Sequence, residues 1–147
     1  MVNNQNHNYY VGSLIVSLIG GILLIFTDFA GWYVYNYYAG VRSWGWVGAG
    51  EFPFGVLFLV PAIFLFYCAV ISFLTLKNAN KPPSKSSIRL GFKLSFVVFI
   101  LALIGGILFV LTVGDVNDWW FGEAFYGGLL GGGLTPLFLH LSLKNIN

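Results

Sequence analysis

Two segments of the sequence, residues 54–76 and 94–114, each run for more than 20 residues without a charged side chain. A helix that crosses a bilayer needs about 20 predominantly apolar residues. Two further segments, 10–27 and 124–143, are also apolar, although the last contains five glycines and His140. Strands of a membrane barrel alternate polar and apolar residues, and these segments do not. The sequence therefore predicts an all-α integral membrane protein with four transmembrane helices.

The composition argues against the main alternatives to a membrane protein. Only 8% of the 147 residues are charged and 58% are hydrophobic, whereas a soluble domain has about 25% charged residues. Seven basic and five acidic side chains are too few to cover the surface of a soluble enzyme of this size. Intrinsic disorder is excluded as well, because it requires low hydrophobicity and high charge.

The charged residues are sorted along the chain into two groups. Six of the seven basic residues lie between the second and third segments or after the fourth, and Arg42 is the exception. All five acidic residues lie on the other side of the predicted membrane or at its boundary. Because basic loops stay in the cytoplasm, we predict a multi-pass protein of the cell membrane whose N- and C-termini are both cytoplasmic. The six basic residues are Lys77, Lys81, Lys85, Arg89, Lys93 and Lys144, and the acidic residues are Asp28, Glu51, Asp115, Asp118 and Glu123.

Three short motifs occur twice in the chain, in the same order. Such agreement is hard to obtain by chance even in apolar sequence, and it predicts two tandem copies of a helix–loop–helix hairpin. Each copy has two spans, so both insert with the same orientation, and a pseudo-twofold axis along the membrane normal relates them. The motif pairs are Leu-Ile-Gly-Gly-Ile-Leu at 18–23 and 103–108, Gly-Glu at 50–51 and 122–123, and the similar helix endings at 74–78 and 141–145.

The predicted organisation is a single four-helix transmembrane domain, residues 1–147. Repeat 1 covers about 10–78 and repeat 2 covers about 94–145, and the connector 79–93 between them carries four of the basic residues. We interpret these charges as topogenic. A site for lipid headgroups or for a partner is the alternative.

Small residues recur at a spacing of four within the predicted helices. In lipid, helices associate where small side chains let their backbones approach closely. We interpret these positions as packing faces between the helices of one bundle. The alternative is that the fourth helix contacts another protein or a second copy of the chain. The predicted helix-packing residues are Ser13, Ser17, Gly21, Ala102, Gly106, Gly127, Gly128, Gly131 and Gly132.

The first outer loop is dense in aromatic residues between positions 32 and 46. Trp and Tyr collect at membrane–water interfaces, which is the simplest explanation of this density. The segment 33–37, the turn-forming Ala39-Gly40 and the returning segment 41–47 also predict a small β-hairpin. Such a hairpin offers an aromatic platform to a partner, a lipid or a sugar. The predicted contact residues in this loop are Trp32, Tyr35, Trp44 and Trp46.

The second outer loop adds Asp115, Asp118, Trp119 and Trp120 to the predicted outer contact surface. We interpret Asp118 and Glu123 as residues that cap or start the fourth helix, where their carboxylates meet the positive end of the helix dipole. A cation site is the alternative, because hard ions bind several carboxylate oxygens. No recognised loop motif has this spacing.

Two polar residues lie within or beside the predicted spans, Asp28 and His140. A carboxylate inside a membrane is costly and often functional. Asp28 lies near the outer end of its span, where it either reaches water or pairs with Arg42. We expect His140 near the inner interface, hydrogen-bonded or hydrated.

No constellation of residues predicts catalysis. Cys68 is the only cysteine, which excludes a dithiol mechanism and an intrachain disulfide. Neither a nucleotide-binding glycine loop nor a Ser/His/Asp arrangement occurs, and the spans contain a single histidine, which gives no pair of haem or metal ligands. The sequence therefore predicts no catalytic residue, no cofactor, no metal site and no nucleic-acid partner.

The outline of the chain is similar to that of claudin-type tetraspans: four spans, inner termini, and an aromatic, sheet-forming first outer loop. The paired cysteines and the Gly-Leu-Trp motif of that family's loop are missing, and only Trp32, Trp44 and Trp46 match it loosely. The likeness is one of architecture. It implies an adhesion or scaffold protein as one functional alternative.

The leading functional expectation is an accessory or structural subunit of a larger membrane protein complex. It rests on the small size, the lack of a catalytic constellation, the nearly uncharged spans and the small-residue faces. The expected partners are the lipid bilayer and other membrane protein subunits or a second copy of the chain. A small transporter or channel with its pathway at the repeat interface is the first alternative, and the claudin-like protein is the second.

Overall fold

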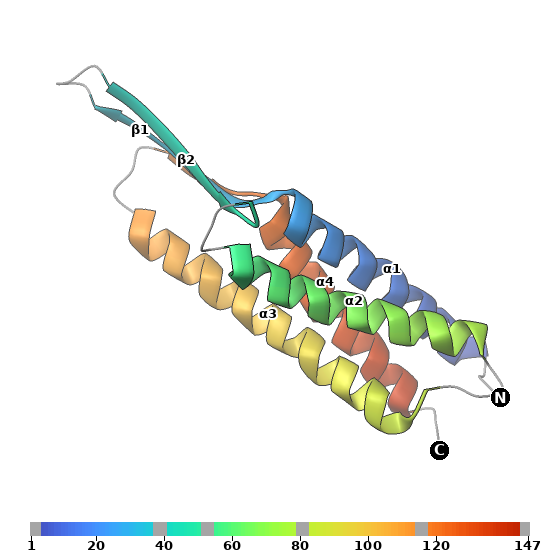
Figure 1. The fold of residues 1–147 in the computed structure, drawn as a ribbon. Helices are drawn as coiled ribbons and strands as arrows, with labels where there is room; N and C mark the ends of the chain where they lie inside the picture. The colour runs from blue at the N-terminus through green and yellow to red at the C-terminus, as the bar shows by residue number, and fades with distance from the viewer. Residues whose placement is uncertain (1–3, 37–40, 51–54, 79–82, 114–117, 145–147) are drawn as a thin grey trace.

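The computed structural model of the chain is mostly helical, with four helices in one bundle and a small three-stranded sheet at one end (Figure 1). The elements are α1 (Asn4–Phe26), β1 (Asp28–Asn36), β2 (Val41–Gly48), α2 (Gly55–Lys77), α3 (Lys85–Val113), β3 (Asp118–Phe121) and α4 (Glu123–Lys144). The residues described are 4–36, 41–50, 55–78, 83–113 and 118–144.

Three of the helices are long and apolar enough to cross a membrane. They are Asn6–Phe26 within α1, Gly55–Lys77, which is α2, and Lys85–Val113, which is α3. Helix α4 has a similar length but contains five glycines and His140, and it is not one of the three. The prediction is therefore confirmed in part: the described chain is mostly helical, and three of its helices are apolar enough to cross a membrane.

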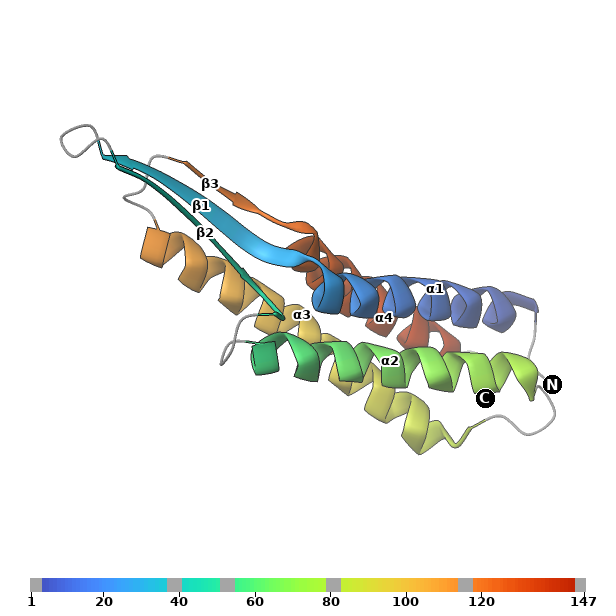
Figure 2. The same cartoon turned by 45° about the horizontal axis from the view of Figure 1, so that its top comes forward.

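Each helix packs mainly against two neighbours. Helix α1 lies against α2 and α4, and α3 lies against the same two helices. The start of α1 and the end of α4 lie at one end of the bundle, and the sheet lies at the other (Figures 1 and 2). The connections from α1 to α2 and from α3 to α4 therefore meet at the sheet end.

The bundle buries several small polar side chains beside its hydrophobic clusters, and it exposes many large apolar side chains. The side chains of Ser13, Ser17 and Ser72 are fully buried, whereas large apolar side chains such as Leu111, which is 75% exposed, cover the outer surface. In water such a surface would drive association, but lipid tails solvate it and leave close helix packing to stabilise the bundle. The distribution of side chains therefore fits a bundle surrounded by lipid.

Local hydrogen bonds lie at the start of α3 and at the end of α1. Helix α3 begins at Lys85, inside the predicted connector 79–93, because the hydroxyl of Ser84 accepts a hydrogen bond from the Ser87 amide at 3.2 Å and caps the first turn. Helix α1 ends just before Thr27, whose hydroxyl donates to the Leu23 carbonyl at 2.8 Å. The chain then continues directly into β1.

The sheet is antiparallel, with the strand order β2-β1-β3. Strands β1 and β2 form the hairpin predicted for the first outer loop. Strand β3, for which no strand was predicted, comes from the second loop and pairs with the other edge of β1, from Ala30 opposite Phe121 to Tyr33 opposite Asp118. Strand β2 leads into α2 and strand β3 leads into α4. These two strands therefore lie on either side of β1, which follows α1.

The sheet continues beyond the ends of α1 and α2 and runs along the end of α3 (Figures 1 and 2). It thus has one face toward the end of α3 and one face away from the helices. Because side chains alternate between the two faces of a strand, the register of the pairing decides which aromatic residues lie on each face.

Candidate functional site

The face of the sheet that points away from the helices carries two tryptophans. Gly31, on the central strand, pairs with Trp46 on β2 and with Trp120 on β3, so the three residues form one row across the sheet. Trp46 is 43% exposed and Trp120 is 50% exposed. We call this row, Trp46–Gly31–Trp120, the tryptophan face.

Glycine is required in the middle of this row. A Cβ atom added to Gly31 would lie 2.5 Å from Cζ2 and 2.7 Å from Cε2 of Trp120, which is too close for any real side chain. The indole therefore lies directly across the backbone of β1. Glycine between bulky residues often marks such a close approach in a strand, and here it keeps the tryptophan face flat.

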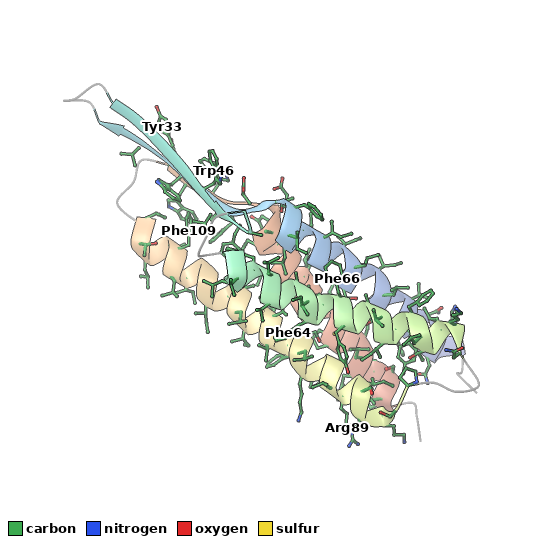
Figure 3. All side chains as sticks on the ribbon, in the orientation of Figure 1. Tyr33, Trp46, Phe64, Phe66, Arg89 and Phe109 are labelled. Atoms are coloured by element: carbon green, nitrogen blue, oxygen red, sulfur yellow. The ribbon has the colours of Figure 1, made fainter. Side chains whose placement is uncertain are left out.

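The opposite face of the sheet is fixed to the helices by an aromatic cluster. Phe109 of α3 lies under Trp32 of β1 and Trp119 of β3, with ring centroids 6.4 and 6.1 Å away (Figure 3). Phe121 of β3 lies 5.9 Å from Phe109 and stacks on Phe125 of α4 at 3.9 Å. Offset and edge-to-face aromatic pairs add about 0.5–1.5 kcal/mol each beyond burial of their area. The sheet is thus held on both α3 and α4.

The same cluster reaches α2 through Phe29, the second residue of β1. The Phe29 ring lies 5.2 Å from Phe58 of α2 and meets Phe125 edge-on at 5.4 Å. All three rings are buried. Because strands from both loops and three helices share one set of rings, the orientation of the tryptophan face follows that of the bundle.

Two other predicted contact residues lie in the hairpin. Trp44 pairs with Tyr33, and Tyr35 pairs with Arg42. The side chains of Tyr35 and Trp44 lie outside the described part of the structure. The side chain of Tyr33 is shown on the sheet, beside that of Trp46, in Figure 3.

The structure separates the acidic residues of the outer loops. Asp28 is exposed at the start of β1 and pairs with Gly48, at the opposite end of the β1–β2 ladder from Arg42. About 20 Å of strand lies between them at roughly 3.3 Å per residue, which removes the ion pair considered for Asp28. Asp118 lies in β3 rather than at the start of α4, and its assignment as a cap is wrong.

Glu123 is the first residue of α4, where a carboxylate meets the positive end of the helix dipole. Glu51 and Asp115 lie outside the described residues. Within the described ranges, no group of three or more His, Cys, Asp or Glu side chains is placed to hold a metal ion.

The predicted helix-packing residues of α4 lie against other helices of the same chain. A Cβ atom at Gly131 would meet Leu65 of α2 at 2.9 Å and Gly20 of α1 at 3.1 Å, and one at Gly127 would meet Leu23 of α1 at 2.7 Å. On the other side of α4, a Cβ atom at Gly128 would lie 3.0 Å from that of Ala102 on α3. Close approach of backbones at small residues is the usual basis of helix association in lipid.

Two of the remaining packing glycines contact aromatic side chains. Gly106 of α3 lies under the ring of Phe125, and Gly21 of α1 lies against the ring of Phe66. Gly20 was not among the predicted packing residues, although a Cβ atom there would lie 2.8 Å from the Gly127 carbonyl oxygen of α4. Gly21, the next residue, was predicted as a packing residue because it lies four positions after Ser17. Spacing alone does not show which helix each face of α1 contacts.

The packing serines of α1 form a buried hydrogen-bonded contact with α2. Ser72 of α2 donates to the Ser13 hydroxyl at 2.9 Å, and Ser17 donates to the Ser13 carbonyl at 2.6 Å. Cys68 makes the corresponding contact on the other side of α2, where its thiol donates to the Gly91 carbonyl of α3 at 3.2 Å. His140 is exposed near the end of α4, with its ring centroid 5.8 Å from that of Phe92.

Comparison with known proteins provides no relative for this arrangement: no protein family model, no curated protein and no solved structure matches the chain.

Proposed function

We propose that the chain is a non-catalytic accessory or structural subunit that binds another membrane protein through the tryptophan face. The observation that carries the proposal is the pair Trp46 and Trp120, about half exposed on either side of Gly31. Tryptophan is among the residues that dominate binding energy at protein interfaces. The rigid attachment of the sheet to the bundle lowers the entropy cost of presenting these rings to a partner.

The helix contacts support the sheet, rather than α4, as the surface that meets the partner. The glycines that made α4 a candidate contact helix, Gly127, Gly128, Gly131 and Gly132, all approach α1, α2 or α3 of the same chain. A partner helix at those positions would have to displace one of them.

We also propose that α4 is a fourth span and that the two hairpins are tandem repeats. In support, α4 packs along α1 and α3, and its low hydropathy reflects glycines that these contacts use. Strands β2 and β3 both precede the second helix of their hairpin and both pair with β1. The repeat is unequal, because only the first hairpin has an outgoing strand.

The orientation that follows from the basic loops places the sheet outside the cell and the start of α3 in the cytoplasm. Asp118→Cys and Ser86→Cys test it, because both positions are exposed and native Cys68 is buried. A membrane-impermeant thiol reagent added to intact cells is expected to label Asp118→Cys alone and to label Ser86→Cys only after permeabilisation. The reverse pattern would contradict the orientation.

The partner is tested by extraction in mild detergent from the native membrane. The expected result is a complex of fixed stoichiometry with another membrane protein, lost in the double variant Trp46→Ala/Trp120→Ala. Phe73→Ala is the matched control, because it truncates an exposed aromatic side chain near the end of α2 that lies opposite the sheet. Recovery of the wild-type chain as a monodisperse monomer would contradict the proposal. Aggregation of vesicles that carry the purified chain would instead indicate an adhesion protein.

One buried group favours a second candidate function, transport through the bundle. The Thr135 hydroxyl, beside Pro136 in α4, is fully buried and has no hydrogen-bond partner among the described residues. Unsatisfied polar groups inside a membrane bundle often belong to a substrate pathway. Ion flux into proteoliposomes that falls in Thr135→Val, with the fold intact, would support this function over that of an accessory subunit.

A further inference from the structure

An open hollow of about 390 Å³ lies between α3 and α4, at the end of the bundle opposite the sheet. Four of its six lining residues carry basic side chains, and the other two are apolar. The lining residues are Arg89, Phe92 and Lys93 of α3 and His140, Leu143 and Lys144 of α4. Figure 3 shows Arg89 near the start of α3, beside the end of α4.

The basic residues converge on this hollow from two helices. Arg89 and Lys93 lie one turn apart on α3, and His140 and Lys144 lie one turn apart on α4. Topogenic charge needs only to lie on one side of the membrane. Topogenic charge does not require the start of α3 and the end of α4 to place their basic groups around one hollow. The arrangement therefore needs a further explanation.

Among the residues that the structure describes, no acidic side chain lies near these charges. The chain has five carboxylate side chains, at positions 28, 51, 115, 118 and 123. Those in the described ranges lie in the sheet or at the first residue of α4, at the far end of the bundle. The potential at the hollow is therefore set by cations, which favours an anionic ligand.

The depth of the hollow indicates the kind of anion. Lys93 is the last charged residue before the uncharged segment 94–113 of α3, and Phe92 and Leu143 place apolar surface beside the basic groups. In a bilayer this boundary between charged and apolar residues lies at the level of the headgroups. Basic pockets between membrane helices at this level bind acidic phospholipid headgroups.

We propose that the hollow binds an anionic phospholipid. Its phosphate lies among Arg89, Lys93 and Lys144, where charge-assisted hydrogen bonds to its oxygens are available, and its glycerol and first acyl carbons lie against Phe92 and Leu143. The proposal rests on the membrane placement of α3 and α4. It does not depend on the tryptophan face, so its failure and that of the partner proposal are distinguishable.

Native mass spectrometry of the full-length chain in detergent micelles tests the proposal, with phosphatidylglycerol, phosphatidylcholine and glycerol 3-phosphate as the added ligands. We expect phosphatidylglycerol to bind more tightly than phosphatidylcholine. The double variant Arg89→Gln/Lys93→Gln should weaken phosphatidylglycerol binding by about tenfold or more, because each basic group near the surface contributes roughly a factor of five. Binding of phosphatidylcholine should stay the same.

The matched control is Lys77→Gln/Lys85→Gln, which removes the same charge near the same end of the bundle but outside the lining of the hollow. Equal weakening by the two double variants would overturn the proposal, because it would indicate attraction by diffuse surface charge. Displacement of the lipid by equimolar glycerol 3-phosphate would also overturn it, because the acyl region would then contribute nothing. Lys144→Gln, at the last residue of α4, repeats the test if the Arg89 variant does not fold.

Discussion

Two adjacent glycines of α4 should respond in opposite ways to the same substitution. A Cβ atom at Gly132 would lie 2.8 Å from the Cα atom of Phe99 on α3, and closer still to the Phe99 amide nitrogen. A Cβ atom at Gly133 would lie 3.4 and 3.5 Å from carbons of the Phe99 ring, which is an ordinary contact. A Cβ atom at Gly132 therefore meets the backbone of α3, which cannot move without the rest of the helix. A Cβ atom at Gly133 meets only the Phe99 side chain.

The magnitude follows from the distance that α3 and α4 must move. Carbon atoms pack at about 3.5–4.0 Å, so Gly132→Ala pushes the two helices apart by more than about half an ångström. Overpacking of this kind lowers the free energy of unfolding by about 1–3 kcal/mol. Replacing a helical Gly by Ala raises it by up to about 1 kcal/mol, because Ala has the higher helix propensity. We expect Gly132→Ala to lower the free energy of unfolding by about 1–2 kcal/mol. Gly133→Ala should leave it unchanged or raise it by up to about 1 kcal/mol.

Cys68 provides the assay. It is the only cysteine of the chain and is buried between α2 and α3, so a thiol reagent reacts with it only when the bundle opens. Purified variants in mild detergent are titrated with a denaturing detergent and pulse-labelled, and the midpoint of labelling is compared with the loss of helical circular dichroism. Equal midpoints for the two variants, or a lower midpoint for Gly133→Ala, would refute the argument from backbone contact.

Three further variants test other contacts. Phe109→Ala should destabilise the chain by about 3 kcal/mol in a thermal unfolding scan, because the ring is buried under the sheet. Phe96→Ala, which removes a ring that is 49% exposed, should cost far less in the same scan. Gly45→Ala should displace the Trp32 indole, which lies across Gly45, and the expected readout is a red shift of tryptophan emission with a loss of about 1–3 kcal/mol. Ser72→Ala, which removes the hydrogen bond from α2 to α1, should cost about 0.6–1 kcal/mol in the Cys68 labelling assay, and a larger loss would indicate a buried polar network.

The sequence was sufficient to predict the parts of the fold that depend on local composition. The uncharged segment 54–76 predicts α2, which runs from Gly55 to Lys77, because hydropathy alone decides where a chain enters lipid. The strand propensity of segments 33–37 and 41–47, on either side of a turn-forming Ala39-Gly40, predicted the β1–β2 hairpin for a similar local reason. Helix α3 starts well before position 94 because a serine cap, rather than the onset of apolar sequence, sets its first turn.

The third strand was missed because its partner is remote. Trp119-Trp120-Phe121 has the aromatic composition of a strand, but four residues do not form a sheet without an edge to pair with, and that edge belongs to β1. The tryptophan face could not be predicted for the same reason, because Trp46 and Trp120 lie in one row only when both strands pair with β1 at Gly31. The hollow between α3 and α4 likewise depends on which side of each helix turns toward the other.

The position of β1 between two returning strands imposes an order on biosynthesis. Strands β1 and β2 leave the ribosome early, whereas β3 follows only after the whole of α2 and α3. Until then one edge of β1 keeps unpaired amide and carbonyl groups, the kind of edge that invites pairing with foreign strands. A chain halted before β3 also lacks the indole that covers Gly31. The finished sheet therefore forms only in molecules in which the chain has been made and threaded past α3 as far as β3.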